Sequence, residues 1–319
     1  MTMEVASVTV VRAPWGKTDL RPFSELGHDG APVGELRFQR ADRTAPDPAL
    51  LLKLLFIDEP LSIQVHPDDS FAQAIGLPHG RTKAWYVLAA EPGARVALGL
   101  KREMTRAQLR AAIADGSIAD LVRWQDVAVG QGLLVPAGTI HAIGAGLVLV
   151  EIQQRSEAGF RLFDHGRQHD IQLDGAVGAA LPGPAAAQVP AMPFSESRTV
   201  IAQSPHFVLE AVDLLPNSHW ELDAGSETWL LLLEGDAIFG RTQVVAGEAV
   251  LIDGERTIVR PSARGARGIL AYVAAAPLPG LLLGRNGIPI AVVAERFPDL
   301  GLGQQLQPEP AARPWARKP

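Results

Sequence analysis

Polar and apolar residues alternate through the segment Leu61–Asp69, and this alternation is typical of a β-strand with one buried face. Successive side chains of a strand point to opposite faces, so Ser62, Gln64 and His66 are expected to share one face, while the two apolar residues between them pack into a core. Short apolar runs separated by glycine, proline and aspartate fill residues 1–170. The pattern therefore predicts an all-β fold for this half of the chain.

Three segments interrupt the strand pattern and favour helices. Met104–Arg123 carries apolar residues near helical spacing with Thr105 as an N-cap, which predicts a helical insertion of two short helices separated at Gly116. Pro48–Leu55 is predicted as a second helical piece. Phe71–Ile75 is expected to add a helical turn after the alternating strand, with the aspartates before it as caps.

The second half of the chain repeats the strand-rich pattern after a break. Leu181–Phe194 is rich in alanine and proline, as linkers are, and residues 199–275 again contain apolar runs separated by turn signals. These features predict two domains. Residues 1–185 form a first barrel that holds the site and the helical insertion, and residues 195–319 form a degenerate barrel, without histidines at ligand spacing, and a tail.

Composition narrows the function classes. The chain has 319 residues, of which 47% are hydrophobic, so it can bury a sizeable core. Its net charge of −6 and scattered basic residues argue against a nucleic-acid partner. There is no cysteine, so any metal must be held by nitrogen and oxygen. The apolar runs are too short to cross a bilayer and no secretory signal is recognisable, which predicts a cytoplasmic protein without a membrane partner.

A second informative segment surrounds His141. It reads as a strand, a Pro-Ala-Gly turn and a histidine that enters the next strand. If this strand lies beside the alternating one, Gln64, His66 and His141 bring two imidazoles and an amide oxygen to one site. Such a set suits a borderline divalent cation, zinc in particular, with a coordination position left open. The alternative is that all three are hydrogen-bonded residues inside a barrel.

Several motifs occur in a consistent order. The spacing from Gly130 to His141, G-x5-P-x-G-x2-H, is similar to the second cupin motif, and Gln64-x-His66 followed by Pro-Asp-Asp resembles the type I phosphomannose isomerases in their short bacterial form. The resemblance extends through Pro14-Trp15-Gly16, Gly34-Glu35, Leu51–Leu55, Ala84–Leu88, Glu151–Gln154 and Phe160–Arg167. It implies two cupin (jelly-roll) barrels, a zinc ion and a small sugar phosphate as substrate.

One position departs from the family pattern. The resemblance implies a glutamate ligand within G-K-T-E, but this chain has Lys83 at that position and Arg81 at the preceding basic one. A charged ammonium donates hydrogen bonds and has no lone pair for a metal. Lys83 and Arg81 are therefore expected to bind the substrate phosphate, and Lys53 is a weaker candidate for the same role.

Two further residues are candidates for catalysis through the resemblance. It implies that Glu151, which follows a buried run, lines the pocket, and that Arg161, ten residues later, is catalytic. The alternatives are a solvated strand end for Glu151 and a surface salt bridge from Arg161 to Asp164. If the segment around Arg161 is extended, its side chain points away from the apolar residues on both sides.

The function implied by the resemblance is the interconversion of mannose 6-phosphate and fructose 6-phosphate. A metal ion would polarise the sugar oxygens, Glu151 would carry the proton, and Arg161 would stabilise the enediolate. Two alternatives remain open. One is a sugar-phosphate-binding cupin that has lost catalysis through Lys83, and the other is a metal-free isomerase of another phosphosugar.

Overall fold

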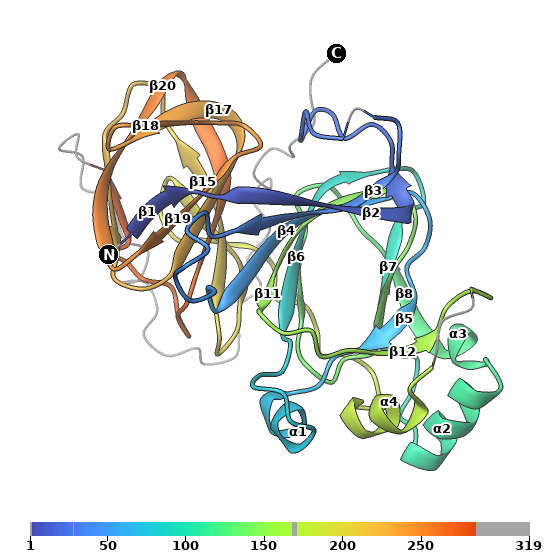
Figure 1. Cartoon of the computed structure of the whole chain (residues 1–319). Helices are drawn as coiled ribbons and strands as arrows, with labels where there is room; N and C mark the ends of the chain where they lie inside the picture. The colour runs from blue at the N-terminus through green and yellow to red at the C-terminus, as the bar shows by residue number, and fades with distance from the viewer. Residues whose placement is uncertain (1, 28, 168–170, 285–319) are drawn as a thin grey trace, which may run out of the picture.

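The computed structural model describes residues 2–27, 29–167 and 171–284, which form two β-barrels side by side (Figure 1). Strands dominate and helices are few and short, so the predicted all-β class is confirmed. The predicted tail lies outside the described residues from position 285 onward. No helix among the described residues has the length and apolar character needed to span a bilayer.

The first barrel consists of two antiparallel sheets. The six-stranded sheet has the order β2 (Ser7–Lys17), β3 (Val33–Gln39), β4 (Leu50–Ile57), β11 (Leu147–Gln154), β6 (Lys83–Ala90) and β9 (Gly132–Val135). The five-stranded sheet has the order β12 (Phe160–Phe163), β5 (Ile63–Val65), β10 (His141–Ile143), β7 (Arg95–Leu100) and β8 (Val122–Asp126).

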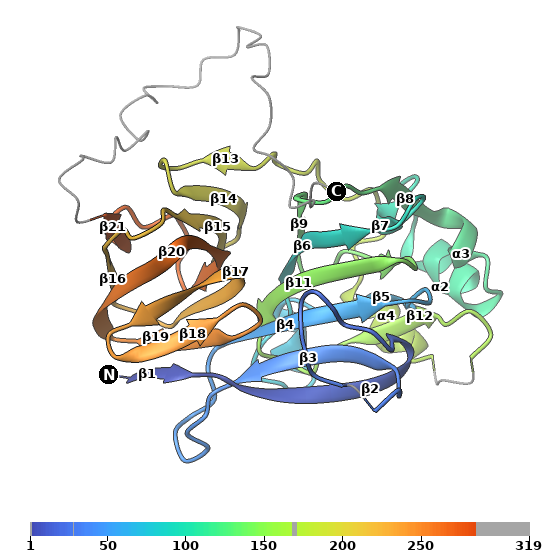
Figure 2. The ribbon, with the colours of Figure 1, turned by 90° about the horizontal axis from the view of Figure 1, so that it is seen from above.

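The second barrel is built from one ten-stranded sheet, seen beside the first barrel in Figure 2. Although it falls within the range predicted for the first barrel, the first strand of the chain, β1 (Thr2–Val5), pairs with β19 of this sheet. The other strands are β13 (Met192–Pro193), β14 (Arg198–Gln203), β15 (Val208–Leu214), β16 (Trp220–Ala224), β17 (Thr228–Phe239), β18 (Thr242–Val245), β19 (Ala249–Asp253), β20 (Glu255–Tyr272) and β21 (Leu282–Gly284).

Four short helices gather at one end of the first barrel (Figure 1): α1 (Asp69–Ala74), α2 (Arg106–Ala114), α3 (Ile118–Leu121) and α4 (Leu173–Ala179). The predicted insertion is confirmed as α2 and α3. Thr105 caps α2, and Gln108 completes a capping box with it. Gly116 separates the two helices at a positive φ of 82°. The helical turn after β5 is confirmed as α1, whose N-cap is Asp68.

The helix predicted over Pro48–Leu55 is wrong, because this segment enters strand β4. Every residue of β4 is buried, so its sequence shows no alternation of polar and apolar positions. Leu52 and Leu54 pack into the core between the two barrels, whereas Leu55 faces the interior of the first barrel. A strand with two buried faces reads as a continuous apolar run, and a buried helix reads the same way.

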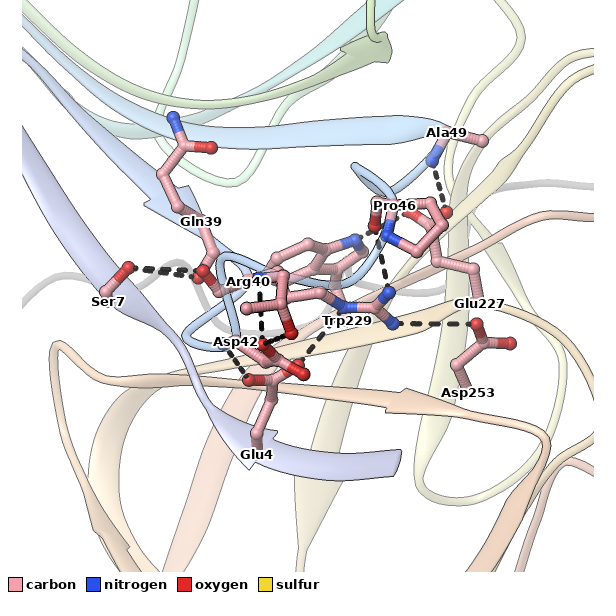
Figure 3. A network of polar contacts seen from close by, with 11 residues as sticks. Glu4, Ser7, Gln39, Arg40, Asp42, Pro46, Ala49, Glu227, Trp229 and Asp253 are labelled. Atoms are coloured by element: carbon pink, nitrogen blue, oxygen red, sulfur yellow. Dashed lines mark hydrogen bonds and ion pairs between the residues drawn. The ribbon is translucent and has the colours of Figure 1, made fainter. Parts of the chain in front are cut away.

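Polar contacts complete the junction between the barrels. Glu227 of the second barrel accepts the backbone N–H groups of Ala49 and Leu50 at the start of β4. Arg40 forms ion pairs with Glu4 at 3.1 Å and Asp253 at 3.7 Å. Figure 3 shows this network. The apolar core and these contacts fix the six-stranded sheet, which carries half of the candidate site, against the second barrel.

Candidate active site

Two stacked histidines lie between the walls of the first barrel. Gln64 on β5 stands opposite His141 on β10, and the turn before His141 returns to β5 through a hydrogen bond from Gly138 N to His66 O of 2.7 Å. The imidazole rings of His66 and His141 lie 4.9 Å apart between centroids, at an interplanar angle of 20°. The structure thus brings together the three residues predicted as a metal set.

Each histidine has a buried ring nitrogen without a hydrogen-bond partner among the described residues. His141 Nδ1 is 2.8 Å from the carbonyl oxygen of Thr139, which can only accept, so Nδ1 carries the proton and Nε2 is left with a lone pair. His141 Nε2 and His66 Nδ1 are buried and have no hydrogen-bond partner among the described residues. Burial, followed by the charge of Lys83, lowers the pKa of His141 to about 3 and that of His66 well below its usual value. Both rings are therefore neutral near pH 7.

A ladder of buried charges crosses the six-stranded sheet on its inner face. Lys83 Nζ lies 3.0 Å from Glu151 Oε2, and Lys53 Nζ lies 3.3 Å from Glu151 Oε1 and 3.4 Å from Glu35 Oε2. Trp85 Nε1 donates to Glu151 Oε2 at 2.8 Å. These residues come from the neighbouring strands β6, β11, β4 and β3, which brings alternating charges together across the sheet.

The ladder holds Glu151 ionised. Burial alone would raise the pKa of Glu151, but the charges of Lys83, Lys53 and Arg81 lower it well below its usual range. Burial lowers the pKa of Lys83 to about 8, although the charge of Glu151 opposes this. Near pH 7, therefore, Lys83 is predominantly an ammonium and Glu151 a carboxylate.

A cavity of about 270 Å³ opens at Gln64, the neighbour of His141 across the sheet, and neither His66 nor His141 is among its lining residues. Gln64 and Arg161 line it together, because Arg161 on β12 pairs in register with Gln64 on β5. Asp164 also lines the cavity and pairs with Arg167 at 2.9 Å. Within the described ranges, the exposed Arg161 side chain has no hydrogen-bond or ion-pair partner. Other lining residues are Pro14, Trp15, Glu35, Leu61 and Ser62.

Arg81 lies at the other side of His66. Its Nε and Nη2 atoms donate to Gln153 Oε1 at 3.1 and 2.9 Å. Gly159 lies next to both side chains and leaves the room that His66 needs, because a Cβ at this position would lie 3.2 Å from His66 Cδ2, whereas Arg81 Nη1, at 3.8 Å, would be in ordinary contact. Arg81 is therefore held close to the histidine pair.

The sequence assigned no role to Glu35 and Trp85, both of which belong to this site. Glu35 lines the cavity and pairs with Lys53, and Trp85 meets His141 edge-on at 5.6 Å between ring centroids. Lys53, a weaker candidate for phosphate binding, is buried between two carboxylates instead. The sequence contained one signal for this ladder, which is a single charged residue within each of several apolar strands. An isolated buried charge needs a partner, so charges of this kind tend to meet one another.

The donor set does not fit the predicted zinc ion. Gln64, His66 and His141 offer three neutral donors, and the described residues contain no group of three or more histidine, cysteine, aspartate or glutamate side chains that could hold an ion together. Glu151, the nearby carboxylate, already accepts from two lysines. A dication at this position would gain no anionic ligand and would be repelled by the ammonium of Lys83.

Comparisons with known proteins give a consistent result. No protein-family model matches the chain. The chain is 33% identical over 168 residues to the mannose-6-phosphate isomerase of Streptococcus mutans, over 50% of this chain and 53% of that protein. It is 29% identical over 230 residues to a mannose-6-phosphate isomerase of Bacillus subtilis, over 70% of this chain and 69% of that protein. The chain thus spans about half the length of the first relative and about two thirds of the second.

Solved structures of such enzymes share the architecture. The crystal structure of the mannose 6-phosphate isomerase from Bacillus subtilis has a TM-score of 0.71 at 20% identity, over 85% of this chain and 100% of that chain. A structure described as a zinc-bound mannose 6-phosphate isomerase has a TM-score of 0.64 at 16% identity, over 86% of this chain and 100% of that chain. At these identities the likeness shows the fold, and it confirms the predicted cupin-like architecture.

Proposed function

We propose that the chain, which is similar in sequence to bacterial mannose-6-phosphate isomerases, interconverts mannose 6-phosphate and fructose 6-phosphate in the cavity of its first barrel. The observation that carries the proposal is the placement of the predicted residues. Gln64, His66 and His141 lie together, Gln64 lines the same cavity as Arg161, and the ion pair of Glu151 with Lys83 lies on the inner face of the facing sheet. These residue types suit proton transfer at a sugar phosphate.

The reaction moves one proton between two neighbouring carbons. The C2–H bond breaks and its proton passes to a base, and the C1 carbonyl becomes part of an enediolate. The carbon proton then returns to C1 while a hydroxyl proton moves from O2 to O1, so C2 becomes the carbonyl and no co-reactant is consumed. Glu151 is the predicted proton carrier. A cationic group stabilises the enediolate oxygens, since preorganised charge is most effective where charge develops. A bound zinc ion would polarise these oxygens, but the donor set does not fit it, so the proposal assigns the cationic role to the residues of the chain.

The phosphate requires its own contacts. Arg81 suits this role, because a guanidinium matches a phosphate with two parallel hydrogen bonds. Arg81 lies close to His66 with its Nη1 atom turned toward Gly159. We assign Arg161 to the reacting centre and its charge, as the sequence predicts, and Arg81 to substrate binding together with Lys83.

A second candidate function is favoured by one observation. Lys83 lowers the pKa of Glu151, and a carboxylate with a very low pKa is a weak base. A protein with this arrangement could bind a sugar phosphate without turning it over. The two candidates differ in one measurable respect, which is the exchange of the C2 proton.

A coupled assay on mannose 6-phosphate tests the proposal, with fructose 6-phosphate converted onward and detected by nicotinamide reduction. Deuterium incorporation from heavy water, followed by NMR, gives a readout that needs no coupling enzymes. We expect turnover by the wild type and by the surface control Arg110→Lys, and strong loss in Arg161→Ala. Binding of mannose 6-phosphate by calorimetry without any exchange would support the second candidate. Turnover of another phosphosugar alone would replace the proposed substrate.

A further inference from the structure

A buried ammonium, that of Lys83 on β6, lies among the site residues. Its side chain is 4% exposed, and Nζ contacts Glu151 Oε2 at 3.0 Å. The same oxygen accepts the indole N–H of Trp85, and the Trp85 ring packs edge-on against His141. One carboxylate oxygen therefore ties the ammonium to the indole that supports the histidine pair.

The charges around the histidines already include several cations. Lys83 is the neighbouring charge with the largest effect on both imidazoles, and Arg81 and Lys53 act on His66 in the same direction. The two carboxylates of the ladder, Glu151 and Glu35, are occupied by lysines. Only neutral donors remain for an added ion, so near pH 7 the site holds a positive charge and offers no free anionic ligand among the described residues.

We propose that the Lys83 ammonium is itself the cation of this site and takes the place of a divalent metal ion beside His66 and His141. The inference rests on the proposed function, because it specifies how the same cavity holds the sugar. An ammonium has three N–H donors, one of which is directed to Glu151, so two donors remain for oxygens of a substrate. As these oxygens gain negative charge during proton transfer, the fixed positive charge stabilises them. Lys83 keeps its proton throughout.

The test compares metal binding in the full chain and three variants. Each protein is stripped with a chelator, dialysed and titrated with zinc by calorimetry, and its zinc content is measured by mass spectrometry. Lys83→Glu replaces the ammonium by a carboxylate ligand. Lys101→Glu is the matched control, because it makes the same charge change at an exposed lysine that binds the Asp120 carbonyl. Lys83→Glu combined with His66→Ala removes the imidazole from the altered site.

We expect the wild type and Lys101→Glu to bind no zinc at the site, Lys83→Glu to bind about one zinc per chain, and the double variant to lose it. Phosphosugar turnover by the wild type should be unchanged by chelator. Three results would overturn the inference: one zinc per wild-type chain that is lost in His66→Ala, turnover that chelator abolishes and zinc restores, or a folded Lys83→Glu protein that gains no zinc. If Lys83→Glu does not fold, zinc titration of the wild type still tests the inference, because one zinc bound per wild-type chain and lost in His66→Ala would overturn it.

Failure of the inference and failure of the proposed function give different results. If the wild type is active but requires zinc, the proposed function is supported and the inference about Lys83 is wrong. If the wild type turns over no phosphosugar and binds no zinc, and Lys83→Glu gains a zinc site, the proposed function is wrong. The Lys83 ammonium would still be the cation of the site.

Discussion

Each barrel buries one glutamate against a cation and an aromatic donor. The two arrangements differ in whether polar atoms nearby remain without a hydrogen-bond partner. In the second barrel, Glu210 accepts from Arg198 at 2.7 Å and from Tyr272 at 2.6 Å, inside a core that is otherwise apolar. In the first barrel, Glu151 accepts from two lysines and Trp85. Arg198, Glu210 and Tyr272 have a partner for every polar side-chain atom.

In the first barrel, some buried polar atoms near the glutamate lack a hydrogen-bond partner within the part of the chain that the structure describes. Among the described residues, His66 Nδ1 and His141 Nε2 have no hydrogen-bond partner, and Gln64, which stands opposite His141, lines a cavity. A buried polar atom without a partner is costly, so a folded protein keeps one where a ligand supplies the missing contact. The contrast teaches that a buried ion pair alone does not identify a site. Unused donors and acceptors beside a cavity are the stronger indication.

The sharpest test of this contrast replaces the two glutamates in turn. Glu151→Gln should lower kcat/KM for mannose 6-phosphate by about 10³-fold, within the range for loss of a general acid or base. Glu210→Gln is the matched control, and its kcat per folded molecule should remain at the wild-type value. Equal losses of activity in the two variants would show that the glutamates do not differ in role.

Substitution of the glutamate in the second barrel should change the free energy of unfolding and leave the activity unchanged. Glu210→Gln leaves Arg198 buried with no anion, and this should lower the free energy of unfolding by about 3–5 kcal/mol, the usual cost of breaking a buried pair. Urea denaturation followed by tryptophan fluorescence measures the change. The double variant Arg198→Met with Glu210→Leu should recover most of the loss, because it removes both charges. No recovery would mean that the pair has a role beyond mutual neutralisation.

A smaller effect is expected at the cavity mouth. Arg161→Lys should lower kcat/KM by about 10- to 100-fold, since hydrogen bonds to charged groups contribute about 1.5–3 kcal/mol. Because Arg161 is exposed, the free energy of unfolding should change by no more than about 0.5 kcal/mol. Steady-state kinetics and denaturation are compared with Arg110→Lys on helix α2. Unchanged kinetics would separate Arg161 from the reaction.

The smallest expected effect is a change of activity with pH. Burial lowers the pKa of Lys83 to about 8, so the ammonium is lost in the folded chain at a pH where the unfolded chain keeps it. Activity should therefore fall as the pH rises through about 8. The contribution of Lys83 to stability should increase from there toward its ordinary pKa of 10.5, because the unfolded state binds more protons in this window. Kinetic and denaturation profiles measure both, and Lys83→Arg should keep its activity to higher pH.

Alternation along the chain was sufficient to place much of the site. Ile63 and Val65 pack into the core while Gln64 lines the cavity, as the period of two predicts. Alternation works here because β5 has one apolar and one polar face. The same rule fails for β4, where both faces are buried and only Lys53 interrupts the apolar run.

Partners across the sheet could not be predicted from the sequence. The ladder from Lys83 to Glu35 joins residues on four strands, and its composition depends on the register of each pair, such as Glu151 opposite Lys53. A sequence supplies the charges, but strand order and register decide which charges meet. The sequence therefore showed that Lys83 occupies the position of a glutamate in the family pattern, but it did not show that Glu151 is the partner of Lys83.

Strand β1 has a consequence for the order in which the chain folds. It closes the edge of β19, although the two strands lie at opposite ends of the described chain. During synthesis, Thr2–Val5 must therefore wait until Ala249–Asp253 has left the ribosome, and a contact this distant in sequence forms late and slowly. A fragment that contains only the second barrel would expose the β19 edge, which is a template for aggregation. Strand β1 thus makes completion of the second barrel depend on residues that precede the first barrel in the sequence.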